Sequence, residues 1–312
     1  MAAERKALHT YIAPRYWHVW LGLGCLRVVC MLPHRSSLAI GRLLGRLAHR
    51  VGAERRAIVR RNIELCFPEK TTAERDHLTR EHFAALGMSV VEMGHGRWAS
   101  DEQIAALCTI ENLEYLTEPL KAGRGIILLS AHFTTIEISG RAVRHAGAHF
   151  DAVYRRNRSP FVTEILRSGR ERSADNTIEK RDIKQMVRRL RAGVAVWYAP
   201  DQSYKRKGAV VVPFFGVPTM HATATSTVAR LGQAVVVPFF PRRTPEGRYI
   251  LRFLPPLDNF PTDDPVADVQ RYVALMEAHI RTCPEQYFWI HRKFKDLPAG
   301  YEDSYADLDA AK

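Results

Sequence analysis

The feature that most constrains the fold is a series of short apolar segments that alternate with helical segments after residue 124. The apolar segments are 125–130, 150–154, 194–200, 209–215, 234–240 and 249–254. Helical patterns lie near 134–146, 160–172, 182–192, 221–231 and 265–283, and Gly193 and Gly232 stand where helix C-terminal glycines belong. This alternation predicts an α/β fold, with a mixed sheet flanked by helices. Such sheets bind ligands beyond the carboxyl ends of their strands.

The heptapeptide AVVVPFF occurs twice, at 209–215 and 234–240. Because the flanking residues do not match, we interpret the two copies as two similar strands rather than as a sequence repeat. The preceding segment, from about 55 to 110, keeps a helical pattern, and Thr71 with Glu74 forms a capping box.

The N-terminal residues indicate contact with a membrane. Residues 16–32 form an apolar run that would reach about 26 Å as a helix, a little short of a ~30 Å hydrocarbon core. In the next helical segment Arg42, Arg46 and Arg50 fall on one flank, and the apolar residues Ile40, Leu43, Leu44, Leu47 and Val51 fall on the other. This pattern is typical of a helix at an anionic membrane surface, although a core-packed helix with a solvated basic face remains open. Gly41 and Gly45 form a GxxxG, but the flanking arginines spoil it as a membrane dimerisation motif.

The charge balance points to an anionic partner. Lys and Arg total 46 against 33 for Asp and Glu, which gives a formal net charge of +13. Nucleic acid, a membrane surface, a phosphorylated substrate or an acidic protein would each suit this charge. The five cysteines are scattered without a CxxC or a Cys/His ligand spacing, which favours a reducing compartment and argues against structural zinc. We expect neither a metal nor another cofactor.

His132 follows the predicted strand 126–130, in the loop that begins the next helix, and Glu137 lies five positions later. A neutral imidazole can remove a hydroxyl proton, and a carboxylate on the first helical turn can hold its other ring nitrogen. The helix N-terminus beside it favours developing negative charge. A structural alternative is that Thr134 and Glu137 form an S/T-x-x-E capping box.

Several motifs occur in order along most of the chain: YWHVWLGLGCL, RRNIELCFPEK, AHFTTIE, YRRNRSP, WYAPDQSYKRKG, VPFFGVPTMHATAT and CPEQYFWIHRKFKDLP. In these the chain resembles the late acyltransferases of bacterial lipid A biosynthesis, closest to the lauroyl-transferring branch. The resemblance implies a glycerol-3-phosphate-acyltransferase-like fold and an enzyme of the Gram-negative inner membrane. Its substrates would be acyl carrier protein as acyl donor and the Kdo-bearing tetraacylated lipid A precursor. The acyl group would pass to the hydroxyl of a 3-hydroxyacyl chain.

Carried onto this sequence, the resemblance implies that His132 is a general base and Glu137 its charge-relay partner, with no covalent acyl-enzyme. Arg155, Arg170 and Arg172 would suit phosphate or Kdo carboxylate, or would lie on solvated helix faces. Asp201 matches the family's PDQ-type site and would orient substrate or His132, with a simple Pro-Asp turn as the alternative. Further basic residues are expected to build the same electropositive surface without chemical roles: Arg242, Arg243, His291, Arg292 and Lys293.

The expected organisation is a membrane anchor with an amphipathic helix over 1–52 and an acyltransferase domain over 53–312. The second part divides into a helical lead-in at 53–120, an α/β core at 121–297 and an acidic tail at 298–312. The basic excess after residue 32 would keep this domain on the cytoplasmic side.

Two other functions compete with this interpretation. A lysophosphatidic acid acyltransferase would share the His chemistry, but such enzymes carry a motif resembling F-P-E-G-T-R. The nearest match, TPEGRY at 244–249, is predicted to be a hairpin turn between two strands. The other alternative is a non-enzymatic basic protein that binds a membrane or nucleic acid. Dispersed arginines and the absence of nucleic-acid-binding signatures argue against a nucleic acid partner.

Overall fold

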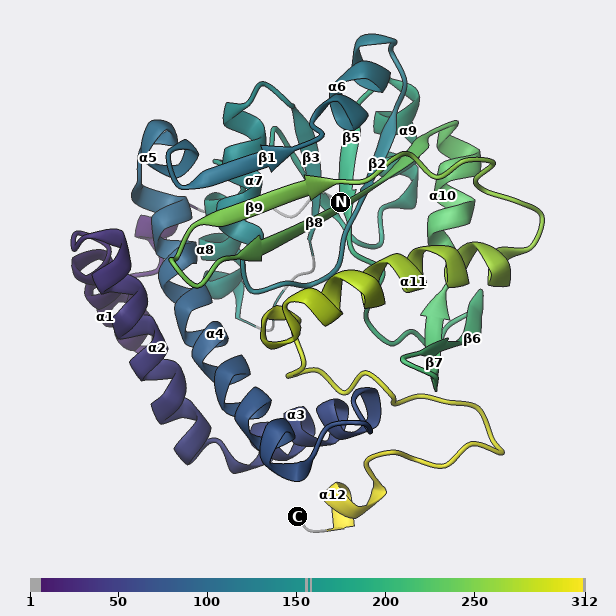
Figure 1. Cartoon of the computed structure of the whole chain (residues 1–312). Helices are drawn as coiled ribbons and strands as arrows, with labels where there is room; N and C mark the ends of the chain where they lie inside the picture. The colour runs from purple at the N-terminus through teal and green to yellow at the C-terminus, as the bar shows by residue number, and fades with distance from the viewer. Residues whose placement is uncertain (1–6, 155–156, 158, 311–312) are drawn as a thin grey trace.

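The computed structural model describes residues 7–154, 157 and 159–310. In this part of the chain seven strands form the main sheet (Figure 1). Their order across the sheet is β1 (Cys108–Glu111), β9 (Tyr249–Phe253), β8 (Val235–Arg243), β2 (Ile126–Leu129), β5 (Ala195–Tyr198), β3 (Phe150–Tyr154) and β4 (Thr177–Glu179). Neighbouring strands run parallel except β8 and β9, which form an antiparallel hairpin. The predicted mixed sheet is confirmed.

Helices cover both faces of this sheet because the buried strands are apolar on both sides. Ile126 and Leu128 of β2 pack in one cluster with α5 (Asp101–Ala105), α6 (Glu114–Lys121) and α7 (Ile136–His145). Ile127 and Leu129 point the other way, as alternation along a strand requires. They pack with α9 (Ile183–Arg191), α10 (Ala224–Gly232) and α11 (Pro265–Thr282).

The two copies of AVVVPFF lie in different sheets. The second copy contributes most of β8, whereas the first forms β6 (Ala209–Phe214), which pairs with β7 (Val217–Ala222) in a separate hairpin. All six predicted apolar segments contain a strand. The prediction missed β1, β4 and β7, which are short or carry polar residues within them.

Of the two glycines predicted to follow a helix C-terminus, only Gly193 does so. Gly193 follows α9 with a φ of +76°, in the left-handed region where glycine is unstrained. Gly232 is instead the last residue of α10, and the left-handed position after it belongs to Gln233, with a φ of 51°. A Cβ at Gly232 would lie 2.9 Å from the Leu190 side chain, so this glycine is required for close approach of α9 and α10.

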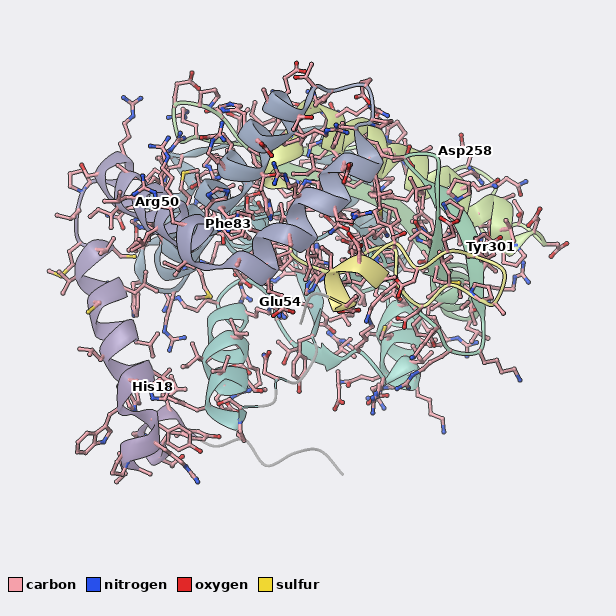
Figure 2. All side chains as sticks on the ribbon, turned by 90° about the horizontal axis from the view of Figure 1, so that it is seen from below. His18, Arg50, Glu54, Phe83, Asp258 and Tyr301 are labelled. Atoms are coloured by element: carbon pink, nitrogen blue, oxygen red, sulfur yellow. The ribbon has the colours of Figure 1, made fainter. Side chains whose placement is uncertain are left out.

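The N-terminal third is helical, with α1 (Trp17–Val29), α2 (His34–Val51), α3 (Ala53–Cys66) and α4 (Thr72–Trp98). The capping box of Thr71 and Glu74 is present at the start of α4. Figure 2 shows α1, which carries His18, at the margin of the molecule, whereas Arg50 of α2 lies near Phe83 of α4. In the described residues no helix combines the length and apolar character needed to cross a membrane.

The residues of α2 that are buried are three small residues, Ser37, Gly41 and Gly45, and one leucine, Leu38. Gly41 and Gly45 pack against α4, where Gly87 supplies a third small residue. The GxxxG therefore joins two helices of one chain. The apolar flank of α2 is left in solvent, with large exposed fractions at Leu43, Leu44, Leu47 and Val51. This arrangement excludes the alternative in which the apolar flank of α2 packs into the core.

The remaining described elements are short or peripheral. α8 (Pro160–Arg170) follows β3, and α12 (Ala306–Ala310) lies at the end of the chain. Three 3-10 turns complete the description: Leu8–Thr10, Pro14–Tyr16 and η3 (Pro284–Gln286).

Candidate active site

The loop between β2 and α7 carries His132 and is held from a distant part of the chain. Phe288 donates its amide to the His132 carbonyl at 3.0 Å, and Thr134 donates to the Gln286 carbonyl at 2.9 Å. Phe133 and Tyr287 form a β-bridge between these contacts. The end of η3 and the segment that follows it therefore fix the backbone on both sides of His132.

Asp201 lies beside His132 because their strands are parallel neighbours. Leu129 of β2 is level with Tyr198 of β5, so residues just beyond these positions meet at one edge of the sheet. The Asp201 Oδ1 lies 2.6 Å from Nδ1 of His132, and Oδ2 accepts the His132 backbone N–H at 3.1 Å. The Asp201 side chain is 3% exposed and that of His132 is 33% exposed. Asp201 thus fixes both the ring and the main chain of His132, and the alternative of a simple turn residue does not describe it.

This contact defines the chemistry available at His132. With Nδ1–H donating to the carboxylate, Nε2 carries a lone pair. The Gln202 side-chain nitrogen lies 3.5 Å from that Nε2. A histidine held in this tautomer can take a proton from a hydroxyl group and pass it on.

The environment keeps Asp201 ionised. Burial by itself would raise the pKa of Asp201, but His132, its hydrogen bonds and Lys293 outweigh burial and hold this pKa well below its usual range. For His291, burial lowers the pKa to about 4, and the nearby His132 lowers it further. His291 is therefore neutral at pH 7.

His132 opens into a cleft with a volume of about 520 Å³. Its walls come from β3, α8, the end of β5 and the segment after η3. Basic and aromatic side chains line the cleft, namely Tyr154, Arg167, Arg170, Lys180, Trp197, Tyr198, Phe288 and His291. A cleft of this size with several cations can receive a large anionic molecule next to the imidazole.

Glu137 does not contact His132 through a hydrogen bond among the described residues. Its Oε1 accepts from Nε of Arg170 at 3.3 Å, and both side chains are about three-quarters buried. The capping-box alternative also fails, because α7 has Thr135 as its N-cap and no side-chain capping bond. Asp201, and not the predicted Glu137, lies at the ring nitrogen Nδ1 of His132. A role for Glu137 in the reaction stays a prediction.

The three predicted anion-binding arginines have different positions. Arg155 lies outside the described residues. Arg170 lines the cleft, whereas Arg172 is exposed and is absent from the cleft lining.

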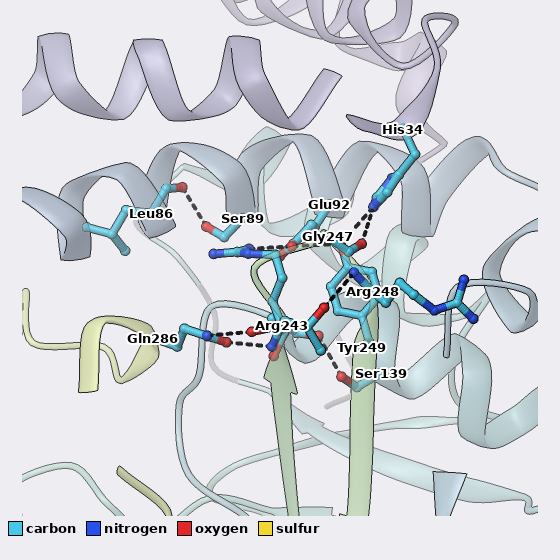
Figure 3. Close-up of polar contacts among 12 residues, drawn as sticks. His34, Leu86, Ser89, Glu92, Ser139, Arg243, Gly247, Arg248, Tyr249 and Gln286 are labelled. Atoms are coloured by element: carbon cyan, nitrogen blue, oxygen red, sulfur yellow. Dashed lines mark hydrogen bonds and ion pairs between the residues drawn. The ribbon is translucent and has the colours of Figure 1, made fainter. Parts of the chain in front are cut away.

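The expected basic surface near the C-terminus is not a single surface. Arg243 is buried and forms an ion pair with Glu92, and Gln286 Oε1 accepts its backbone N–H at 2.7 Å (Figure 3). Lys293 is buried behind Asp201, and Arg292 pairs with Asp309. His291 lines the cleft, and Arg242 is half-buried. Only His291 of this group borders the cleft.

Figure 3 also shows how the N-terminal helices connect to the sheet. Tyr249 of β9 donates to Glu92 at 2.8 Å, and His34 of α2 contacts both Tyr249 and the Gly247 carbonyl. The Gln286 side chain accepts the backbone N–H of Arg243, and the Gln286 carbonyl accepts the backbone N–H of Thr134, next to the His132 loop. One polar network therefore links α2 and α4 to the segment that holds His132.

The sequence interpretation missed several residues near His132. Gln202 directly follows Asp201, and Arg167 lies one turn before Arg170 on α8, so their closeness to predicted site residues could have pointed to them. Nothing in the sequence pointed to Trp197 or Lys180 as residues of the cleft. Within residues 7–154, 157 and 159–310 no group of three or more His, Cys, Asp or Glu side chains is placed to hold a metal ion.

Comparisons with known proteins match nearly the whole chain. The family model described as bacterial lipid A biosynthesis acyltransferase matches residues 4–296. A lipid A biosynthesis lauroyltransferase from Escherichia coli (strain K12) is 38% identical over 297 residues, which covers 94% of this chain and 96% of the relative. A lipid A biosynthesis acyltransferase from Haemophilus influenzae is 36% identical, with coverages of 92% and 93%. A lipid A biosynthesis palmitoleoyltransferase from Escherichia coli (strain K12) is 33% identical, with coverages of 98% and 100%.

Proposed function

Because this chain belongs to the family of bacterial lipid A biosynthesis acyltransferases, we propose that His132 is the general base of its acyl transfer. The acyl chain, lauroyl, comes from acyl carrier protein. It passes to the hydroxyl of a 3-hydroxyacyl chain on the Kdo-bearing tetraacylated lipid A precursor. The observation that carries this proposal is the His132 ring, held at Nδ1 by Asp201 and facing a basic cleft.

In the proposed step Nε2 of His132 takes the proton of the acceptor hydroxyl as its oxygen attacks the thioester carbonyl carbon. A C–O bond forms, and the tetrahedral intermediate then breaks its C–S bond. The thiolate leaves and takes the proton back from the imidazolium. Asp201 stabilises the imidazolium between these events, so no covalent acyl-enzyme and no external co-reactant is needed.

The charges of the cleft suit an acceptor with phosphate and carboxylate groups. Arg167, Arg170 and Lys180 border the cleft that contains His132. Arg forks bind such groups in a bidentate way. In this proposal Glu137 acts through Arg170, whose guanidinium it orients, and the amides at the start of α7 favour negative charge beside His132.

The choice of lauroyl rests on the order of the sequence identities among the relatives. The lauroyltransferase relative is 38% identical, compared with 33% for the palmitoleoyltransferase and 27% for a myristoyltransferase of the same organism. This order favours lauroyl as the transferred chain.

The location that fits this function is the cytoplasmic side of the Gram-negative inner membrane. Support comes from the exposed flank of α2, where Leu43, Leu44 and Leu47 project beside Arg42 and Arg46. An apolar flank bordered by arginines binds anionic bilayers in the interfacial plane. Trp17 and Leu21 of α1 are exposed as well.

The two alternative functions are less well supported. TPEGRY forms the turn of the β8–β9 hairpin, so it does not act as a phosphate motif of lysophosphatidic acid acyltransferases. A non-enzymatic membrane-binding protein would have no use for a histidine held by a buried carboxylate.

The test is mass spectrometry of the lipid A precursor after incubation with the protein and a mixture of acyl carrier protein thioesters of different chain lengths. A mass gain of one dodecanoyl chain is the expected result. Parallel reactions contain lysophosphatidic acid, or the precursor without Kdo, as acceptor. Acylation of lysophosphatidic acid alone would replace the proposed function by its alternative, and no acylation of any acceptor would refute it.

A further inference from the structure

Lys293 is a buried cation directly behind the His132–Asp201 pair. Its side chain is 4% exposed, and its Nζ donates a hydrogen bond to the backbone carbonyl of Asp201. The ammonium also lies 4.5 Å from the centroid of the Phe214 ring. Neither the expected surface role nor the reaction described above accounts for a lysine in this position.

A lysine ammonium is buried only where nearby negative charge offsets the loss of hydration. The hydrogen bond of Lys293 goes to the backbone carbonyl of Asp201, and the negative charge of the buried Asp201 carboxylate acts on the ammonium through space. In the resting state His132 must be neutral to act as a base, so it brings no charge to balance Asp201. Lys293 supplies that balance without occupying the ring nitrogen.

The other titratable groups near Lys293 are Cys66 of α3, His221 of β7, Glu277 of α11 and Tyr305. Tyr287, after η3, faces the Asp201 side of the pair. Burial raises the pKa of Cys66 and of Tyr287 well above their ordinary values, so both are neutral at pH 7. Burial lowers the pKa of His221, so it is also neutral.

Glu277 provides a structural alternative, because it is the second acidic group near Lys293. Its Oε1 accepts the backbone N–H of Phe215 at 2.7 Å, and burial raises its pKa. If Lys293 served only to balance Glu277, its removal would affect folding and leave the acid limb of the kcat/KM profile unchanged. This difference makes the two roles separable.

We propose that Lys293 is a positioning residue whose buried ammonium keeps Asp201 ionised and keeps a proton off the His132–Asp201 pair at neutral pH. The proposal rests on the acyl transfer proposed above. Lys293 touches neither substrate and acts only through Asp201.

The expected direction of the effect follows from charge. Removal of a cation beside the pair favours its protonated state, so the apparent pKa of the pair rises. The acid limb of kcat/KM then moves to higher pH. Burial, opposed by Asp201, lowers the pKa of Lys293 to about 8, so the ammonium is still charged where this limb lies.

The experiment compares pH profiles of kcat/KM for the full-length wild type, Lys293→Met, Lys293→Arg and Lys295→Met. Lys295 lies two residues away with an exposed side chain near Asp296, so its variant is the matched control. Lys293→Met should move the acid limb upward by about one pH unit or more, with about a tenfold loss on the acid side that shrinks as pH rises. Lys293→Arg should keep the limb near its wild-type position, and Lys295→Met should leave it unchanged.

Each outcome decides the proposal. A Lys293→Met enzyme with an unshifted limb, whether its rate is normal or uniformly lower, would overturn it and favour the structural role beside Glu277. If Lys293→Arg does not fold, the limb of Lys293→Met decides alone. Should Lys293→Met not fold either, Lys293→Gln provides the same neutral side-chain test. A wild type that transfers no acyl chain would refute the proposed function instead, which separates the two failures.

Discussion

Glu137 Oε1 accepts a hydrogen bond from Nε of Arg170 at 3.3 Å, and this ion pair joins the first turn of α7 to the last residue of α8. Arg170 lines the cleft, so the pair reaches the proposed substrate without touching His132. The chain thus places two carboxylates near the same cleft, with different partners. Glu137 contacts the Arg170 guanidinium, whereas Asp201 contacts the imidazole of His132.

These two carboxylates predict different effects of amide substitutions. Asp201→Asn should lower kcat by about 10²- to 10⁴-fold, because it removes the charge that stabilises the imidazolium and disturbs the tautomer. Glu137→Gln should mainly raise KM for the acceptor, by about tenfold, because it removes the charge that pairs with Arg170. Steady-state kinetics at equal melting temperature provide the measurement. The reverse ranking, with Glu137→Gln the more damaging to kcat, would return the relay role to Glu137.

The position of His132 could be predicted from a local pattern, whereas Asp201 was predicted as its partner only as one of two roles that the family resemblance implies. A strand followed by a histidine is a local pattern, and the end of β2 lies where the apolar run stops. The partner depends on which strand lies beside β2. That neighbour is β5, 69 residues later at the Asp201 contact, and no local spacing reports it. The H-x4-E spacing drew attention to Glu137 because it is short, not because the two side chains meet.

Lys293 illustrates a second limit of the sequence. A lysine within HRKFK has the composition of a solvated basic segment, so its burial depends on contact with a residue 92 positions away. The α2 helix is a third case. Its apolar and basic flanks were identified correctly, but the side that packs on α4 contains only one large apolar residue, Leu38, and is otherwise made of small residues that carry no hydropathy signal.

The glycine contact between α2 and α4 predicts a large effect of a single methyl group. A Cβ at Gly45 would lie 2.1 Å from the Phe83 carbonyl oxygen, so Gly45→Ala should destabilise the protein by about 1–3 kcal/mol despite alanine's better helix propensity. Gly24→Ala on α1 is the control, since nothing lies within 4 Å of its added Cβ. Urea unfolding in detergent would measure both. Equal stability of the two variants would contradict the close packing of α2 on α4.

Membrane attachment should depend on the exposed leucines of α2. Replacement of Leu43, Leu44 and Leu47 by Gln should weaken binding to anionic vesicles at least about tenfold, because the apolar area buried in the bilayer is lost. Leu231→Gln on α10, also exposed, should bind as the wild type does. Sedimentation with vesicles gives the binding constants. Substitutions are preferable to removal of residues 1–52, because that deletion would uncover Ala85, Met88 and Val91 of α4.

The acyl donor should bind more weakly as salt rises. The chain carries +13 and acyl carrier protein is acidic, so their attraction is screened beyond a Debye length of ~8 Å at physiological ionic strength. The apparent KM for the protein-bound donor should therefore increase with added salt. An acyl thioester of pantetheine, which lacks the acidic protein, is the matched control and should show little change. Parallel salt responses of the two donors would exclude electrostatic docking of the carrier protein.

The last prediction concerns stability and pH at His82, a fully buried histidine of α4. Its Nδ1 lies 3.0 Å from the Glu285 carbonyl oxygen, and Nε2 has no hydrogen-bond partner among the described residues. Burial, partly opposed by the Glu285 contact, lowers the pKa of His82 to about 4. The unfolded chain therefore takes up a proton near pH 6.5 that the folded chain refuses until about pH 4.

The sign of this linkage makes the folded state less stable as pH falls through that window. The contribution of His82 is unchanged above pH 6.5 and declines by about 3 kcal/mol in total as pH approaches 4. His82→Gln cannot titrate, so its stability should fall less between pH 7 and pH 5, by about 2 kcal/mol relative to the wild type. Urea unfolding of both proteins at the two pH values isolates the contribution of His82 to the pH dependence of stability. The contributions of His95, His279 and His291, whose pKa values burial also lowers to about 4, are the same in both proteins. A stability difference between wild type and His82→Gln that is the same at pH 7 and pH 5 would show that His82 titrates alike in the folded and unfolded chain.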